Sequence, residues 1–136
     1  MSQPDCLYRI SVKALILDEQ KRFLLVKQID DRWEFPGGGL DFGEGPRECL
    51  IREIKEEIGL EIISIADCPT YLLTALHRTG EWWMANVLYE VKVKDLNFQP
   101  SDECVEIRFF TKEEAKKVEL LPNVVEFLKV CDLGRY

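Results

Sequence analysis

The sequence predicts an α+β protein in which a mixed β-sheet is flanked by helices. Short runs rich in β-branched and aromatic residues occur in both halves of the 136-residue chain, and such runs are typical of strands. A stretch with apolar residues three and four positions apart lies between them, and further helical stretches follow the last strand. The order strands, helix, strands, helices favours helices packed on the faces of the sheet.

The chain begins with two strands and a long loop. Residues 7–17 and 23–28 are the first β-rich runs, and the polar residues 18–21 between them predict a hairpin turn. Residues 29–45 contain Pro36 and most of the glycines of the chain. We therefore expect a loop before the first helix.

A helix is predicted from Pro46 to Gly59. Proline suits the first turn of a helix, and glycine suits the left-handed residue that ends it. The apolar stripe at helical spacing consists of Leu50, Ile51, Ile54 and Ile58. This stripe should face the core.

The second half of the chain contains further strands and two helices. The predicted strands are residues 62–65, 71–76, 82–93 and 105–110. Every odd position from Trp83 to Val93 is apolar, and this period of two predicts a half-buried strand. Thr111 and Glu114 have the spacing of a capping box, which opens a short helix. Pro122 begins the last helix, which carries Val124, Val125, Phe127, Leu128 and Cys131.

Composition and charge exclude several classes of protein. The chain is 46% hydrophobic and 32% charged, without repeats or linkers, so we expect one soluble domain over residues 1–136. A net charge of −7 argues against a duplex nucleic acid partner, although a metal could supply positive charge for a small anion. The single histidine, His77, argues against a His-rich zinc centre or a Ser-His-Asp triad.

The predicted location is the cytoplasm. The chain shows neither a basic-then-apolar leader nor an apolar run of membrane length. Its five cysteines, from Cys6 to Cys131, are scattered without a C-x-x-C pair, as expected of reduced packing residues. We expect no membrane association and a monomer or homodimer.

The most specific feature is residues 38–60, GGLDFGEGPRECLIREIKEEIGL. Glu53, Glu56 and Glu57 are three and four residues apart, so they share one face of the helix, beside the apolar stripe. Like charges at this spacing destabilise a bare helix. A bound divalent cation would offset that cost, and Mg²⁺ prefers oxygen ligands.

The surrounding residues support this interpretation. Glu44 lies just before the helix, where its charge meets the positive end of the helix dipole, and Arg52 can pair with Glu48 or Glu56. Glycines 37–39 let the backbone approach a metal or phosphate closely, and a carbonyl from this loop could complete the oxygen shell. A solvent-facing acidic helix is the alternative, but it leaves the glycines, the arginine and the fixed spacings unexplained.

Residues 38–60 resemble the signature box of the Nudix hydrolases. The box residues are Gly38, Glu44, Arg52, Glu53, Ile54, Glu56, Glu57, Gly59 and Leu60, and every fixed position is filled. Residues 33–38, WEFPGG, are similar to the loop before the box in MutT-type members. The resemblance implies an α/β/α sandwich whose mixed sheet is flanked by helices, including the catalytic box helix. It also implies Mg²⁺-dependent hydrolysis of a nucleoside diphosphate linked to another group, with Mn²⁺ as a possible substitute.

The resemblance implies roles for the box residues. The implied metal ligands are Glu53, Glu56, Glu57 and the backbone carbonyl of Gly38. Glu53 is alternatively the base that activates water, and Arg52 and Glu44 hold the carboxylates in place. Because family members differ in the base, Glu103 and Glu106 are further candidates. Either of these could instead be a surface acid near the start of a strand.

Residues outside the box are candidates for substrate binding. They are Lys27, Trp33, Phe35, Trp82, Trp83, Asp102 and Asn123. Lys27 could reach a phosphate or be an ordinary strand-end lysine, and the aromatic residues could stack on a base or belong to the core. Asp102 falls where some purine-handling relatives place acids that read the base. Asn123 resembles the base-contacting asparagine of MutT-type members, although we favour a helix cap for it.

The predicted function is that of a Mg²⁺-dependent nucleotide pyrophosphohydrolase acting on a nucleotide-type small molecule. Neither the proline of ADP-ribose-type members, expected at residues 75–76, nor the tyrosine of the dinucleoside polyphosphate type, expected near residues 76–78, is present. These absences favour a MutT-like nucleoside triphosphate or modified nucleotide. The alternatives are a non-catalytic nucleotide-binding or sensor module, a hydrolase of nucleotide sugars or dinucleoside polyphosphates, and an isomerase of prenyl diphosphates.

Overall fold

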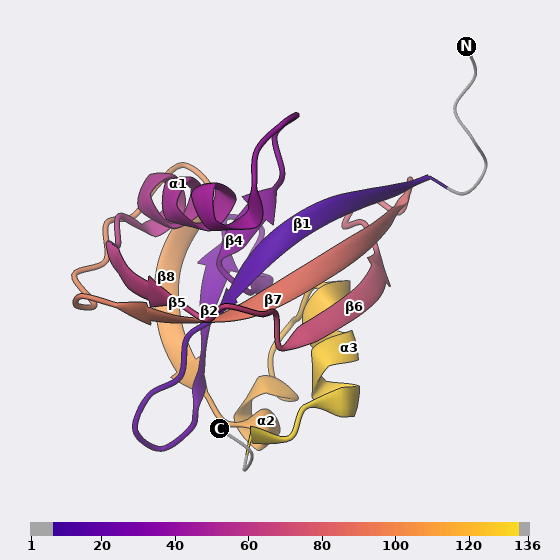
Figure 1. The fold of residues 1–136 in the computed structure, drawn as a ribbon. Coiled ribbons are helices and arrows are strands. Elements are labelled where there is room, and N and C mark those ends of the chain that lie inside the picture. The colour runs from indigo at the N-terminus through magenta and orange to yellow at the C-terminus, as the bar shows by residue number, and fades with distance from the viewer. Residues whose placement is uncertain (1–6, 134–136) are drawn as a thin grey trace.

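The computed structural model describes residues 7–133, which form a layer of strands between helices (Figure 1). Cys6 and the first residues, where a leader would begin, lie outside the described residues. The strands are β1 (Tyr8–Leu15), β2 (Phe23–Gln28), β3 (Trp33–Glu34), β4 (Gly37–Gly39), β5 (Ile62–Ile65), β6 (Tyr71–Leu76), β7 (Trp83–Val93) and β8 (Cys104–Phe110). The helices are α1 (Pro46–Ile58), α2 (Lys112–Ala115) and α3 (Pro122–Val130). The predicted α+β class is confirmed.

The strand layer contains two sheets. In the mixed sheet, β7 pairs in parallel with β1 on one side and antiparallel with β6 and β5 on the other, and β4 extends the sheet beyond β1. The second sheet is antiparallel, in the order β3-β2-β8. The predicted hairpin turn at residues 18–21 starts a β-pairing, because Leu17 bridges to Phe23. β1 and β2 then diverge into different sheets, which the sequence pattern did not predict.

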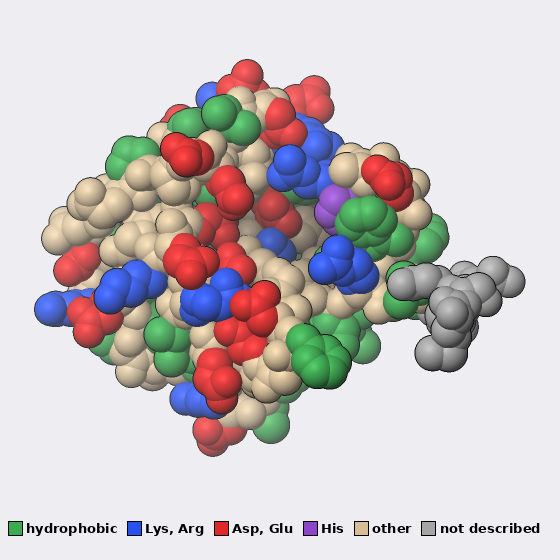
Figure 2. Space-filling view, turned by 90° about the horizontal axis from the view of Figure 1, so that it is seen from above, with side chains coloured by type: hydrophobic (Ala, Val, Ile, Leu, Met, Phe, Trp, Pro, Cys, Tyr) green, Lys and Arg blue, Asp and Glu red, His purple; other side chains and the backbone are tan. Residues whose placement is uncertain are grey.

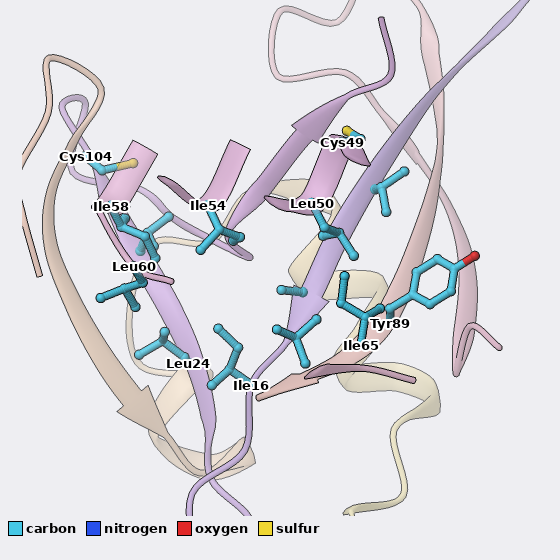
Figure 3. Packing of buried hydrophobic residues seen from close by; sticks show 14 residues of the cluster. Ile16, Leu24, Cys49, Leu50, Ile54, Ile58, Leu60, Ile65, Tyr89 and Cys104 are labelled. Carbon is cyan, nitrogen blue, oxygen red and sulfur yellow. The ribbon is translucent and has the colours of Figure 1, made fainter. Parts of the chain in front are cut away.

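Helix α1 covers one face of the strand layer. It begins at Pro46, and Gly59 ends it with a φ of 69°, as predicted. Leu50, Ile54 and Ile58 are fully buried, and they point toward Ile16, Leu24 and Ile65 in the cluster shown in Figure 3. The inclusion of Ile51 in the stripe was wrong, because its side chain is 53% exposed.

Helix α3 covers the opposite face, so the middle of β7 is buried on both sides, whereas Trp83 and Lys92 near its ends are exposed. Tyr89 and Val91 of β7 pack in the cluster under α1, whereas Leu88 packs with Phe127 of α3. The prediction of a half-buried strand was therefore wrong for β7. The layers α1, strands, and α2 with α3 form the expected α/β/α sandwich (Figure 1).

The predicted starts of the last two helices are confirmed. Thr111 accepts a hydrogen bond from the Glu114 N–H at 3.1 Å, and the Glu114 carboxylate accepts one from the Thr111 N–H at 2.9 Å. α3 starts at Pro122. Within residues 7–133, no helix combines the length and the apolar character needed to cross a membrane.

Candidate functional site

A cavity of about 300 Å³ opens between the box helix and the start of α3. Figure 2 shows the hollow and the acidic side chains gathered around it. The acidic residues that line it are Glu34, Glu53, Glu57 and Glu103, and the basic residues are Lys13, His77 and Arg78. The cavity therefore combines a cluster of carboxylates with a few positive groups.

The central strands build the floor of the cavity. In β1, Ser11 and Lys13 point to the same face, because side chains two apart in a strand share a face. Ser11 pairs across the sheet with Asn86 of β7, and its hydroxyl donates to the Asn86 Oδ1 at 2.6 Å. Both residues are almost fully buried, so the sheet presents a polar floor to the cavity.

Glu57 is the buried carboxylate of the site, with 7% of its surface exposed. Its Oε2 accepts the N–H of Gly37 at 3.4 Å, and its Oε1 accepts the S–H of Cys104 at 3.2 Å. Burial raises the pKa of Glu57 to about 7, although the charge of Lys13 opposes this shift. A cation beside this buried carboxylate would stabilise its charged form.

Arg52 organises the carboxylates at the rim. Its Nε and Nη2 each donate to a Glu44 oxygen at 2.8 Å, and its Nη1 donates to Glu53 at 2.8 Å and to Glu56 at 3.3 Å. The hydrogen bonds from Arg52, with one from the Asp41 N–H, lower the pKa of Glu44 to about 2. The predicted alternative partner of Arg52, Glu48, instead accepts the Gly45 N–H.

The glycine loop lies directly against the carboxylates. A Cβ at Gly38 would lie 2.5 Å from the carboxyl carbon of Glu53, and one at Gly37, where φ is 128°, would lie 2.2 Å from the Val12 carbonyl oxygen. A side chain at Gly37 would clash with the backbone of β1, whereas one at Gly38 would require the Glu53 side chain to move. The Gly38 carbonyl accepts the S–H of Cys49 at 3.5 Å.

The donor set fits a hard divalent cation such as Mg²⁺. Glu53, Glu57 and Gly38 line the cavity, whereas Glu56 is 62% exposed and lies outside the lining. All the candidate ligands are oxygens, as Mg²⁺ prefers. Among the described residues no three acidic, histidine or cysteine side chains already converge on one point, since Arg52 draws Glu53 outward while Glu57 faces Cys104.

Lys13, Glu34 and Asn86 belong to the site but were missed in the sequence. The Nζ of Lys13 lies 2.8 Å from the Glu34 Oε1, and Asn86 accepts the hydroxyl of Ser11. Each is a polar residue within an apolar strand or next to the glycine loop. A buried polar residue in such a run needs a partner, and that signal could have identified them.

Asn123 lines the cavity and does not cap α3. The N-cap residue is Leu121, and its side chain makes no capping hydrogen bond. The Nδ2 of Asn123 donates to Glu34 at 3.2 Å and to Asn86 at 3.3 Å. Its Oδ1 is buried and finds no partner in the described part of the chain. The cap interpretation was therefore wrong.

Trp33 and Phe35 lie in the core. Their exposed fractions are 4% and 0%. Trp33 packs edge-on against Phe110 and Phe35 against Phe127, each with ring centroids 4.9 Å apart. Neither ring is accessible to a base, so the assignment of these two residues to substrate binding was wrong.

Other candidates from the sequence fall in different places. Lys27 and Asp102 lie outside the cavity lining. The Nζ of Lys27 lies 3.6 Å from the Oδ1 of Asp31. Glu103 lines the cavity but Glu106 does not. His77 also lines the cavity, and its ring stacks on that of Trp82 with centroids 4.2 Å apart.

The match to a family model extends over nearly all of the described chain. Residues 7–130 match the model of the NUDIX domain. The chain belongs to the Nudix family. α1 is accordingly the Nudix helix, and the cavity lies beside the Nudix box.

Two curated relatives align with about half of this Nudix protein. RNA pyrophosphohydrolases of a Nitratiruptor species and of Ruthia magnifica subsp. Calyptogena magnifica are 42% identical over 72 residues and 45% over 69 residues. Each alignment covers 48% of this chain, and 46% and 38% of those proteins. The chain therefore spans less than half the length of these curated relatives.

Solved structures agree in fold over nearly the whole chain. The MutT protein from Methanosarcina mazei Go1 has a TM-score of 0.74 and 23% identity, with 98% of this chain and 97% of that chain covered. A MutT NUDIX hydrolase from Burkholderia pseudomallei has a TM-score of 0.73 and 17% identity, with 92% and 99% covered. At these identities the likeness concerns the fold alone.

Proposed function

We propose that this Nudix protein hydrolyses a pyrophosphate bond in a nucleoside diphosphate linked to another moiety, with Mg²⁺ as cofactor. The observation that carries the proposal is the arrangement of Glu53, Glu57 and Gly38 around one cavity. Arg52 and Glu44 hold the neighbouring carboxylates. A nucleoside triphosphate or modified nucleotide is the proposed substrate.

Different residues of the cavity would bind the metal and accept the proton. Glu57 and the Gly38 carbonyl, which line the cavity, would hold the metal together with Glu56, whose exposed side chain would have to turn toward it; Glu53 would be a further ligand or the base. When bound, Mg²⁺ supplies positive charge to the phosphates and acidifies a bound water. Glu53 or Glu103, which both line the cavity, accepts the proton of the water whose oxygen attacks phosphorus. The new P–O bond forms as the bond to the bridging oxygen breaks.

The buried amides offer a means of binding the nucleobase. Asn123 has an unpartnered Oδ1 among the described residues, and its Nδ2 is held by Glu34 and Asn86. A base amino group could satisfy this acceptor if Asn123, which lines the cavity, turned its buried Oδ1 toward the cavity. We assign base contact to Asn123 and withdraw it from the buried aromatic residues.

The 5′ end of an RNA is a second candidate substrate. Two relatives that share about half of this chain are named RNA pyrophosphohydrolases, and a 5′-triphosphate end presents the same phosphate chain as a free nucleotide. The charge of −7 opposes extensive contact with a longer nucleic acid.

A substrate panel tests the proposal. Purified protein with Mg²⁺ is incubated with nucleoside triphosphates, modified nucleotides, nucleotide sugars, dinucleoside polyphosphates and a 5′-triphosphorylated oligoribonucleotide. Release of phosphate, pyrophosphate or nucleoside monophosphate should need the metal and collapse in Glu57→Gln. The exposed Glu61, which pairs with Lys94 on the surface, provides the control Glu61→Gln. No turnover of any compound would refute the proposal, and a ligand that binds and stays intact would favour a sensor module.

A further inference from the structure

Lys13 lies at the floor of the cavity with only 5% of its surface exposed. It belongs to β1, between β4 and β7, and pairs with Gly37 on one side and Leu88 on the other. Its Nζ lies 2.8 Å from the Glu34 Oε1 and donates to the Gly37 carbonyl at 3.1 Å. A buried lysine is rare unless a partner holds it.

The ammonium group of Lys13 has one more donor than these contacts use. An ammonium group carries three N–H bonds. In residues 7–133, Glu34 and Gly37 accept two of them. Because Lys13 lines the cavity, the third donor can serve a molecule bound there.

The charge of Lys13 persists at neutral pH. Burial lowers the pKa of Lys13, but the carboxylates of Glu34, Glu57 and Glu53 outweigh burial and raise the pKa overall. The other basic groups that line the cavity are His77 and the exposed Arg78. Lys13 is thus the buried positive charge of the lining, among four carboxylates.

Lys27 differs from Lys13, although in the sequence it was one candidate for a phosphate contact. It is part-exposed, lies near Asp31, and does not line the cavity. Both lysines lie on strands in the middle layer, so Lys27 is a matched control for a change at Lys13.

We propose that Lys13 binds a phosphate oxygen of the substrate through its third N–H. The inference rests on the proposed function and specifies how the site binds a polyphosphate. Glu34 and Gly37 hold the ammonium in place, and the phosphate receives a charge-assisted hydrogen bond from a group that is already desolvated and oriented.

Phosphate binding and a merely structural role predict opposite effects on metal affinity. A lysine that repels a cation but attracts a phosphate should, when its charge is removed, leave metal binding equal or tighter and phosphate binding weaker. A lysine that only ties Gly37 in place should, when removed, weaken both, because the glycine loop carries Gly38.

Calorimetry with two probes separates these outcomes. Mg²⁺ alone is titrated first, and then imidodiphosphate, a non-hydrolysable pyrophosphate analogue, at saturating Mg²⁺. In Lys13→Met the dissociation constant for imidodiphosphate should rise roughly 10- to 100-fold while that for Mg²⁺ stays equal or falls. Lys13→Arg should recover most of the phosphate affinity, and Lys27→Met should match the wild type.

The contrary results are equally specific. Unchanged imidodiphosphate binding in Lys13→Met, or weakening of both probes, overturns the role of Lys13 while wild-type turnover upholds the proposed function. If wild type neither binds imidodiphosphate nor turns over any substrate, the proposed function itself fails. Should the variant not fold, a crystal structure of wild type with Mg²⁺ and imidodiphosphate decides, because Lys13 Nζ must lie within hydrogen-bond distance of a phosphate oxygen.

Discussion

Arg52 and Glu44 form a two-point hydrogen-bonded pair across eight residues of sequence. The Nε and Nη2 of Arg52 each lie 2.8 Å from one Glu44 oxygen. The remaining nitrogen, Nη1, is thereby directed at Glu53 and Glu56. One guanidinium thus couples the loop before the Nudix helix to two carboxylates on the helix.

Replacing Arg52 by lysine should disable the site without unfolding the protein. An ammonium group lacks the planar fork, so it cannot hold Glu44 at two points and also reach Glu53. We expect kcat to fall roughly 10- to 100-fold, and the free energy of unfolding to fall by less than about 1 kcal/mol because the pairs are partly exposed. Arg47→Lys, on the same helix, serves as control. Wild-type kcat in Arg52→Lys would contradict the role of the fork.

Adding a methyl group at Gly38 should displace the Glu53 carboxylate. The new Cβ would lie 2.5 Å from its carboxyl carbon, and the flexible end of Glu53 can move away, so the fold should survive. Displacement by about 1 Å can cost roughly 100-fold in rate. Gly39→Ala should cost far less, because its Cβ would find only the Ile10 oxygen at 3.9 Å. Steady-state kinetics and Mg²⁺ titrations of both variants measure this, and equal effects would contradict it.

The buried carboxyl of Glu57 should make the metal-free protein less stable as pH rises. Its folded pKa of about 7 lies above the ordinary value of 4.5, so its contribution to stability is fully present below pH 4.5 and is lost as pH rises through 7. The loss amounts to about 3 kcal/mol. Glu44 has its pKa lowered to about 2. Its contribution to stability therefore changes only below pH 4.5, outside this range.

Denaturant unfolding in EDTA between pH 4.5 and 8 measures this effect. In Glu57→Gln the decline should be largely absent, whereas the exposed Glu61→Gln should retain it. Added Mg²⁺ should stabilise the wild type more at pH 8 than at pH 5, because the metal competes with the proton for Glu57. An identical pH dependence in wild type and Glu57→Gln would refute the assignment.

Asn123 should affect both stability and the choice of nucleobase. Asn123→Ala removes hydrogen bonds to Glu34 and Asn86, which should cost about 1–2 kcal/mol of unfolding free energy. The ratio of kcat/KM between nucleoside triphosphates of different bases should also change. Asn97→Ala, at an exposed position, should alter neither quantity. An unchanged base preference in Asn123→Ala would remove Asn123 from base recognition.

The sequence predicted most of the elements because local signals define them, but the short strands β3 and β4 lie within residues 29–45, which were predicted as loop. Pro46 and Gly59 bracket α1, and Thr111 with Glu114 opens α2, since proline, glycine and capping residues act within a few positions. The separation of β1 and β2 into different sheets depends on β7 and β8, which are distant in sequence. A local pattern cannot report such pairing.

The site was predicted only in part, because some of its residues come together through long-range strand pairing. The fixed spacing of Glu53 and Glu57 on one helix defines their common face, whereas Lys13 and Asn86 come together only through the pairing of β1 with β7. Trp33 and Phe35 were predicted to bind substrate because the sequence does not distinguish an aromatic residue that packs in the core from one that contacts a ligand. Burial alone distinguishes these roles.

The parallel pairing of β1 with β7 also joins two segments that are far apart in the sequence. Residues 8–15 cannot form this pairing until residues 83–90 are present. Pairing between segments so far apart in sequence is slow compared with helix formation. A nascent chain that ends at residue 80 already carries the complete box, yet it lacks the strand that supplies Asn86. We therefore expect a partly made chain that ends before β7 to lack the assembled site, although it carries the Nudix box.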